Sequence, residues 1–158
     1  MNILVLCTGN SARSILLESI FNTYGAGRVR AWSAGSKPTG VVHPQSLKLL
    51  GKLSHDITSA RSNSWDEFAS PDAPAMDLVI TVCGSAADEE CPIWPGAPLR
   101  AHWGVDDPAA VPPKDWENAF SVAYETLERR ARALLSKEIE SMSPQQLQTE
   151  LKAISALA

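Results

Sequence analysis

The stretch Cys7-Thr-Gly-Asn-Ser-Ala-Arg-Ser14 decides the fold, because the chain changes character at both of its ends. Before it, the apolar and β-prone residues 3–6 predict a short buried strand. After it, apolar residues at helical spacing predict a helix over about residues 12–24. A Gly- and Ser-containing turn that leads from a buried strand into a helix is typical of an α/β domain.

The rest of the chain continues this alternation of strands and helices. Strands are predicted at residues 29–33, 77–82 and 98–103, and helices at residues 43–53, 64–69, 116–140 and 143–157. We therefore predict a small three-layer α/β domain with a parallel sheet flanked by helices. We interpret residues 1–158 as one domain, with a core over 1–135 and an added C-terminal helix in 136–158. The charged run Glu128, Arg129, Arg130 and Arg132 is predicted to be a solvated helix face.

Composition and charge exclude several classes of function. The chain has 158 residues, of which 44% are hydrophobic and 20% charged, which is ordinary for a globular protein. A formal net charge of −4 argues against a nucleic-acid binder, because neutralising phosphates needs clustered Lys and Arg. The N-terminal apolar run is too short for a secretory signal or a membrane span. We expect a cytoplasmic monomer that binds neither nucleic acid nor membrane.

Residues 7–14, which we call the oxyanion loop, combine a thiol with groups that attract an anion. Gly9 and Asn10 tolerate unusual backbone angles, so consecutive N–H groups can point inward. The following helix adds the positive potential of its N-terminus, and Arg13 can grip two oxygens at once. The predicted oxyanion-binding residues are Thr8, Gly9, Asn10, Ser11, Ala12 and Arg13. The same field, with the Ser14 hydroxyl, is expected to lower the pKa of Cys7 and favour its thiolate. The alternative is an ordinary turn with a buried Cys and a surface Arg.

The three cysteines, Cys7, Cys83 and Cys91, are an odd number and do not resemble a disulfide framework. Cys7 and Cys83 each follow a predicted strand, so both should lie at the edge of the sheet where ligands bind. Cys91 lies in an acidic loop from which it could return to Cys83. Two thiols that form one disulfide supply two electrons. Two alternatives stay open, a static Cys83–Cys91 bridge and two unrelated cysteines.

The C-x5-R-S pattern directly after an N-terminal strand resembles the low-molecular-weight protein tyrosine phosphatase family. The resemblance implies a four-stranded parallel sheet. It also implies Cys7 as nucleophile, Arg13 as oxyanion ligand and Ser14 as support for the thiolate. In that family the general acid is the Asp immediately before a Pro, which implies Asp107 rather than Asp106.

Two longer stretches, from Cys83 to Pro95 and from His102 to Ala109, resemble the thioredoxin-coupled arsenate reductases, which share the phosphatase fold. This resemblance runs over about residues 1–135. It implies that Cys7 attacks arsenate, that Cys83 attacks Cys7 and releases arsenite, and that Cys91 then attacks Cys83. The resulting disulfide would be reduced by thioredoxin or another thiol donor, with no tightly bound cofactor. Trp94 could belong to a thioredoxin-docking surface or be a packed loop aromatic.

The sequence departs from that family at three places. Ala12 occupies a position that is often Cys, and the spacing between Cys83 and Cys91 is one residue longer than the family pattern. Some members hold a potassium ion. The matching positions here are Asn10, Glu18 and Ser33, but Asn63 stands where an Asp is expected. Because an anionic ligand is lost, and because no zinc-type spacing of Cys and His occurs, we predict no metal site.

Three functions remain to be compared. The first is reduction of arsenate through the relay Cys7, Cys83 and Cys91, and the second is a tyrosine phosphatase that uses Cys7, Arg13 and Asp107. The third is a non-catalytic module that binds an oxyanion. Replacement of Cys83 by Ser separates them, because only the reductase needs that thiol.

Overall fold

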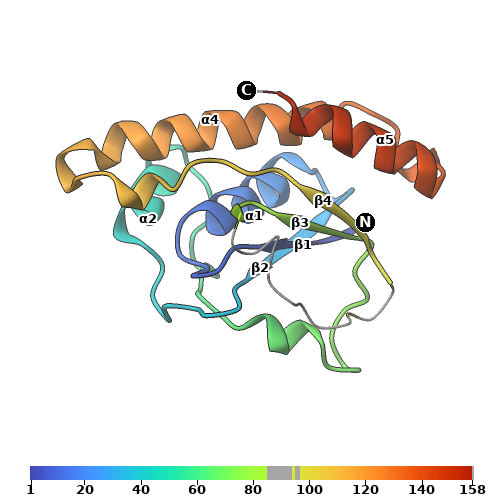
Figure 1. Cartoon of the computed structure of the whole chain (residues 1–158), viewed down its shortest axis with the longest axis horizontal. Helices are drawn as coiled ribbons and strands as arrows, with labels where there is room; N and C mark the ends of the chain where they lie inside the picture. The colour runs from blue at the N-terminus through green and yellow to red at the C-terminus, as the bar shows by residue number, and fades with distance from the viewer. Residues whose placement is uncertain (85–93, 95–96, 158) are drawn as a thin grey trace.

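A computed structural model describes residues 1–84, 94 and 97–157 of the chain. Its centre is a four-stranded sheet in the order β2-β1-β3-β4, in which all neighbouring strands are parallel. The strands are β1 (Asn2–Leu6), β2 (Arg30–Ala34), β3 (Leu78–Thr81) and β4 (Leu99–His102). The predicted parallel sheet is therefore confirmed, and each strand lies within two residues of its predicted bounds (Figure 1).

The helices also follow the sequence pattern. They are α1 (Arg13–Tyr24), α2 (Pro44–Lys52), α4 (Trp116–Leu135) and α5 (Pro144–Ser155), with short 3-10 turns at Trp65–Phe68, Pro108–Ala110, Pro113–Asp115 and Ile139–Ser141. The long predicted helix ends five residues early, because its last turn is the separate 3-10 turn Ile139–Ser141. Within the described ranges, no helix is both long and apolar enough to cross a bilayer.

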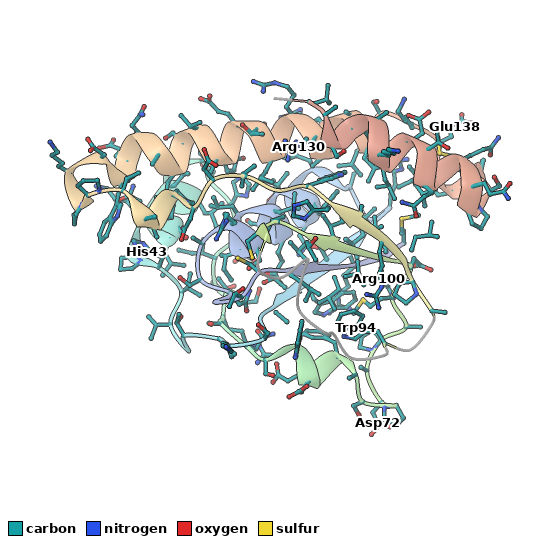
Figure 2. The ribbon with its side chains drawn as sticks, viewed as in Figure 1. His43, Asp72, Trp94, Arg100, Arg130 and Glu138 are labelled. Atoms are coloured by element: carbon teal, nitrogen blue, oxygen red, sulfur yellow. The ribbon has the colours of Figure 1, made fainter. Side chains whose placement is uncertain are left out.

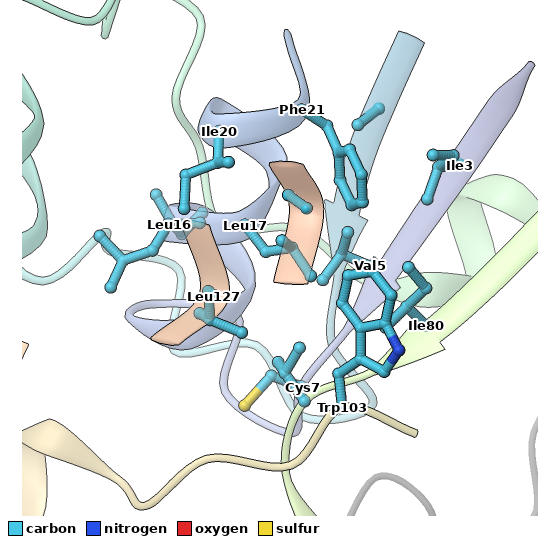
Figure 3. Packing of buried hydrophobic residues seen from close by; sticks show 14 of the residues in the cluster. Ile3, Val5, Cys7, Leu16, Leu17, Ile20, Phe21, Ile80, Trp103 and Leu127 are labelled. Carbon is cyan, nitrogen blue, oxygen red and sulfur yellow. The ribbon is translucent and has the colours of Figure 1, made fainter. Parts of the chain in front are cut away.

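Alternating strand residues divide the core between the two faces of the sheet. Ile3 and Val5 of β1 belong to the large cluster that includes α1, α4 and α5, whereas Leu4 and Leu6 face Trp65 and its neighbours on the opposite side. The alternation has the period of two expected for a strand that is buried on both faces. Figure 3 shows part of the larger cluster, where Cys7 lies at the end of β1 beside buried apolar side chains.

Trp103, directly after β4, ties the C-terminal helix to this core. Its side chain is fully buried, its ring centroid lies 6.0 Å from that of Phe21, and its Nε1 donates to the Leu151 carbonyl oxygen at 3.3 Å. Helix α5 thus docks beside the edge strand β4. Trp32 and Trp116, by contrast, are only partly buried, at the margin of the core.

Candidate active site

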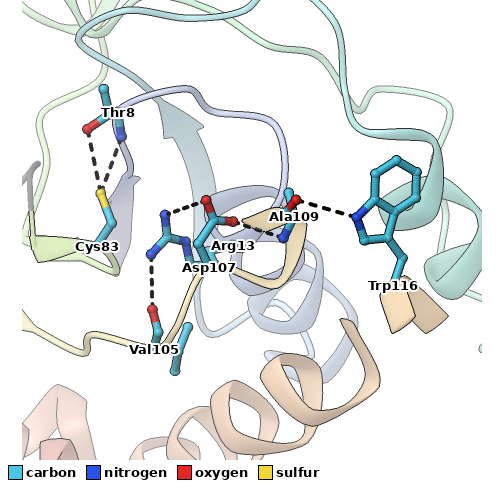
Figure 4. Close-up of polar contacts among 7 residues, drawn as sticks. All are labelled: Thr8, Arg13, Cys83, Val105, Asp107, Ala109 and Trp116. Atoms are coloured by element: carbon cyan, nitrogen blue, oxygen red, sulfur yellow. Dashed lines mark hydrogen bonds and ion pairs between the residues drawn. The ribbon is translucent and has the colours of Figure 1, made fainter. Parts of the chain in front are cut away.

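Cys7 and Cys83 are brought together by the pairing of β1 with β3. Leu6 is in register with Thr81, so the residues that follow the two strands leave the same edge of the sheet side by side. The Cys83 Sγ accepts the Thr8 N–H at 3.4 Å and lies 3.7 Å from Thr8 Oγ1 (Figure 4). The Cys7 and Cys83 side chains are neighbours, and both are buried with no disulfide between them. The prediction that these two thiols meet at one sheet edge is confirmed.

The oxyanion loop is shaped by hydrogen bonds to its outer side. The carbonyl oxygens of Thr8, Gly9 and Ser11 each accept a 3.0 Å hydrogen bond from a main-chain N–H in residues 37–43. In a trans peptide the carbonyl and the following N–H point in opposite directions. The N–H groups that follow these carbonyls are therefore turned inward, and Asn10 helps the turn by adopting a φ of 46°. This is the geometry of a main-chain anion nest.

Gly35, at the end of β2, allows the neighbouring segment to approach the oxyanion loop. A Cβ atom at this position would lie 2.7 Å from the Cys7 carbonyl oxygen and would also collide with the Thr8 carbonyl oxygen. Both obstacles are main-chain atoms of the loop itself, so a side chain cannot be fitted by a change of rotamer. Glycine at this position is thus a condition for the shape of the oxyanion loop, and the sequence offered no local signal for it.

Arg13 begins α1 and reaches across the site. Its Nη1 donates to the Val105 carbonyl oxygen at 3.0 Å, and its Nη2 lies 3.7 Å from Asp107 Oδ2. Its Nε is buried and has no hydrogen-bond partner among the described residues. An unpaired buried donor costs free energy, so this N–H is suited to an anion held by the oxyanion loop.

Asp107 stands at the opposite side of the site from the thiols. Its side chain is 45% exposed, and its Oδ1 accepts the Ala109 N–H at 3.0 Å at the start of the Pro108–Ala110 turn. With Oδ1 in that hydrogen bond, the other carboxylate oxygen, Oδ2, points toward Arg13 (Figure 4). A carboxyl group that is accessible to solvent and held next to the anion-binding arginine is well placed for proton transfer. Asp106 is exposed as well, but the contact with Arg13 is made by Asp107.

A buried polar network supports the oxyanion loop from behind. Asn10 Nδ2 donates to Ser14 Oγ at 2.8 Å and to Ser33 Oγ at 2.9 Å, while its Oδ1 accepts the Asn63 N–H at 2.8 Å. The Ser33 hydroxyl in turn donates to Glu18 Oε2 at 3.1 Å. Since Ser14 accepts from Asn10, its own proton remains available as a donor.

The residues that match the potassium site of some family members belong to this same network. Asn10, Glu18 and Ser33 do lie together, but their oxygens take part in hydrogen bonds with one another and with Asn63, whose side-chain amide donates to the Ser33 carbonyl oxygen at 2.8 Å. An Asn presents N–H donors where an Asp would present only oxygens. At this position Asn63 therefore offers one oxygen and no negative charge, where an Asp would offer two oxygens and a charge.

Glu18 of α1 is partly buried in this network rather than exposed on the helix surface. Burial raises the pKa of Glu18 to about 7, although the hydrogen bonds from Ser33 act in the opposite direction. The neutral form of this side chain is thus favoured more strongly in the folded protein than in the unfolded chain.

For Cys7, the expectation of a lowered pKa is wrong in this arrangement. The hydrogen bond with Cys83 and burial raise the pKa of Cys7 above its ordinary value, whereas Arg13 and the Gly9 N–H act to lower it. The sequence argument counted the groups within the oxyanion loop but not the second thiol, which folding places against the first. The two sulfurs are neighbours, as the attack of one sulfur on the other in thiol–disulfide exchange requires.

Other candidate residues are placed as follows. Cys91 lies outside the described residues. The Trp94 side chain is buried and packs at 6.2 Å from the Trp65 ring, which favours the packed aromatic over a docking surface. His102 Nδ1 is hydrogen-bonded to Thr81 Oγ1 at 2.7 Å between adjacent strands. Sequence reasoning assigned Thr8 to the oxyanion loop but missed its hydrogen bond to Cys83.

Comparison with known proteins agrees with this geometry. The sequence profile of the low molecular weight phosphotyrosine protein phosphatase family matches residues 2–152. This chain belongs to that family. An arsenate reductase of Bacillus cereus (strain 03BB102) is 39% identical over 127 residues, which are 80% of this chain and 89% of the relative.

Solved structures with the family fold extend the comparison. The crystal structure of an arsenate reductase from Archaeoglobus fulgidus superposes with a TM-score of 0.67 at 27% identity, covering 85% of this chain and 99% of that one. A thioredoxin-dependent arsenate reductase from Corynebacterium glutamicum also has a TM-score of 0.67 at 24% identity, covering 89% of this chain and 63% of that one. The second likeness concerns the fold alone.

Proposed function

We propose that this protein reduces arsenate to arsenite through a relay of its three cysteines. The observation that carries the proposal is the contact between the Cys7 and Cys83 thiols beside an anion-binding loop. A phosphatase of this family needs Cys7, Arg13 and Asp107, but it has no use for a second thiol against the nucleophile. The 39% identical relative is itself named an arsenate reductase.

In the first step the Cys7 sulfur attacks arsenate held by the oxyanion loop and by Arg13, and the proton of the Cys7 thiol passes to an arsenate oxygen. A sulfur–arsenic bond forms and an arsenic–oxygen bond breaks. Asp107 donates a proton to the departing oxygen, which leaves as water. The inward N–H groups and the Arg13 guanidinium stabilise the negative charge that develops on the arsenate oxygens. The Ser14 hydroxyl, which accepts from Asn10, supports the Cys7 thiolate with its own proton.

In the second step the Cys83 sulfur attacks the Cys7 sulfur. A disulfide forms, the sulfur–arsenic bond breaks, and its electron pair stays on arsenic, which leaves as arsenite. The Thr8 N–H and hydroxyl, at 3.4 and 3.7 Å from Cys83 Sγ, hold this sulfur and can stabilise its thiolate. Two electrons have then passed from the two thiols to arsenic.

In the third step Cys91 attacks Cys83, which frees the Cys7 thiolate and leaves a Cys83–Cys91 disulfide. This step rests on the sequence and on the chemistry of thiol exchange. A dithiol donor must then return two electrons, and thioredoxin is the donor that we propose. The Corynebacterium glutamicum protein that shares the fold is thioredoxin-dependent.

The test is arsenate-dependent oxidation of NADPH in the presence of thioredoxin and thioredoxin reductase. We expect turnover by the wild type and none above background by Cys83→Ser, because that variant has no thiol to displace arsenite. Aryl phosphate hydrolysis serves as the matched measurement. Phosphatase activity that survives Cys83→Ser, together with no arsenate turnover by the wild type, would assign the protein to the phosphatases instead. Binding of phosphate with neither activity would leave a non-catalytic module.

A further inference from the structure

Arg130 is a charged side chain that the protein buries, although its sequence neighbourhood predicted a solvated helix face. Only 7% of Arg130 is exposed, whereas the adjacent Arg129 is exposed. Arg132, two residues further along α4, pairs with Glu128 at 2.9 Å. Arg130 is marked on α4 in Figure 2. The expectation of a solvated residue is therefore wrong at this one position of the run.

The contacts of Arg130 are made to main-chain carbonyls rather than to a carboxylate. Its Nε donates to the Leu157 carbonyl oxygen at 2.9 Å, and its Nη1 donates to the Gly104 carbonyl oxygen at 3.2 Å. No ion pair with Arg130 occurs among residues 1–84, 94 and 97–157. Burying a charged guanidinium costs desolvation energy, so an arginine here is a poor source of stability compared with an apolar side chain of similar size. An effect other than packing is therefore the more natural reason for an arginine here.

Gly104, whose carbonyl accepts from Arg130, is the first residue of the segment that leads to the candidate acid Asp107. We call residues 104–107 the acid segment. The Val105 N–H donates to the Val82 carbonyl oxygen at 3.2 Å, and the Val105 carbonyl oxygen accepts from Arg13 at 3.0 Å. Asp107 then lies 3.7 Å from the same guanidinium. Arg130 therefore fixes the acid segment one residue before the contacts that connect it to Arg13 and to Val82, which follows β3 and precedes Cys83.

The surroundings give the acid segment room to move if this anchor is lost. A cavity of about 450 Å³ lies between the acid segment and α4, and both Asp107 and Arg130 line it. A segment that borders a cavity is not held in place by close packing on that side. On that side the acid segment is held by the hydrogen bonds at Gly104 and Val105, between the buried residues Trp103 and Pro108.

We propose that Arg130 is a positioning residue, which fixes the acid segment through the Gly104 carbonyl and thereby sets the Asp107 carboxyl group for proton transfer to the departing oxygen. This inference rests on the proposed function for its catalytic consequence. Arginine suits the role because its guanidinium can donate to two carbonyls in different directions, whereas the lysine ammonium is a single point of charge. The bond to Leu157 also connects the end of the C-terminal segment to the site.

The test uses the full chain with Arg130→Met, which keeps the bulk of the side chain but removes its donors. Single-turnover arsenite formation, measured with excess reduced enzyme, is expected to fall about 10-fold, since small misplacements of catalytic groups carry penalties of this order. In an Asp107→Asn background the same substitution should cost less than about twofold, because a group that acts through Asp107 has nothing left to position. Arg129→Met on the same helix is the matched control and should leave the rate unchanged.

A purely structural role would give a different pattern. Equal losses from Arg130→Met with and without Asp107, or no loss at all, would overturn the proposal. If Arg130→Met does not fold, Arg130→Lys takes its place, and it should show a smaller loss that likewise disappears in the Asp107→Asn background.

Amide hydrogen exchange at Val105 keeps this test separate from that of the proposed function. If the wild type does not reduce arsenate, the proposed function fails but the positioning role can still be measured. Faster exchange of the Val105 amide in Arg130→Met and not in Arg129→Met would then support the anchor. Unchanged exchange would overturn it.

Discussion

The oxyanion loop and the acid segment are two halves of one site that are held in different ways. The loop is backed by the buried network around Asn10 and by three hydrogen bonds from residues 37–43. The acid segment is exposed at Asp107 and is held by single hydrogen bonds from Val105, Arg13 and Arg130. A rigid anion site and a more adjustable proton donor suit their tasks, because binding needs fixed dipoles whereas proton transfer needs access to solvent.

Arg13 is the contact between the two halves, and its replacement by lysine should have the largest effect. Arg13→Lys keeps the charge but loses the paired donors that reach the oxyanion and Val105. We expect kcat/KM for arsenate reduction to fall about 10³-fold, in the range seen when an oxyanion-binding donor is removed. Steady-state kinetics with thioredoxin as electron donor measures this change in kcat/KM. A loss of less than tenfold would mean that the inward N–H groups hold the oxyanion well enough without the paired donors of the Arg13 guanidinium.

Asp107→Asn tests the acid segment alone. The Asn side chain can still accept the Ala109 N–H and begin the Pro108–Ala110 turn, so the backbone should be preserved. We expect kcat to fall about 10²-fold through loss of the proton donor. Asp106→Asn, at the exposed neighbouring position, is the control and should change kcat by less than about twofold. A larger effect at Asp106 would exchange the roles of the two residues.

Gly35→Ala tests how rigidly the oxyanion loop is built. The added Cβ would lie 2.7 Å from the Cys7 carbonyl oxygen, so loop and β2 must separate. We expect the free energy of unfolding to fall by about 3 kcal/mol, as for other forms of overpacking. Gly51→Ala in α2 is the control, and it should raise the free energy of unfolding. The nearest atom to its added Cβ would be 3.9 Å away, and alanine favours helices more than glycine does. Urea unfolding measures both, and a stable Gly35→Ala protein would show that the loop can yield.

The smallest expected effect is a pH dependence that comes from Glu18 behind the oxyanion loop. Its pKa of about 7 in the folded protein lies above the ordinary 4.5, so folding favours the protonated form. The stabilisation is complete below pH 4.5 and is lost as the pH rises through 7. Because the side chain is partly exposed, we expect a difference on the order of 2 kcal/mol.

Glu18→Gln isolates this contribution. The amide stays neutral at every pH, so the difference in unfolding free energy between wild type and variant should shrink or change sign as the pH rises from 5 to 8. Chemical denaturation at several pH values checks this. A difference that does not vary with pH would mean that Glu18 titrates as an ordinary surface carboxylate.

The difference between the two halves also explains what could be predicted. The strand, turn and helix around the oxyanion loop are local, so apolar periodicity and the C-x5-R-S spacing indicated all three. In the acid segment the only local signal was the pair Asp107-Pro108, and such pairs are common in turns. The role of Asp107 as general acid was implied by the family resemblance. Its contacts come from Arg13, Val82 and Arg130, which lie far from it along the chain.

By itself, the sequence determined the parallel α/β architecture, the oxyanion loop and the convergence of two strand-end cysteines, because each follows from local patterns and from the polarity of parallel strands. Only the tertiary structure decided that Cys7 and Cys83 share a hydrogen bond, which raises rather than lowers the pKa of the nucleophile. It also decided that Arg130 is buried and that Gly35 must lack a side chain. The burial of a side chain and the close approach of two main-chain segments depend on residues distant in sequence, and no local pattern predicts which residues these will be.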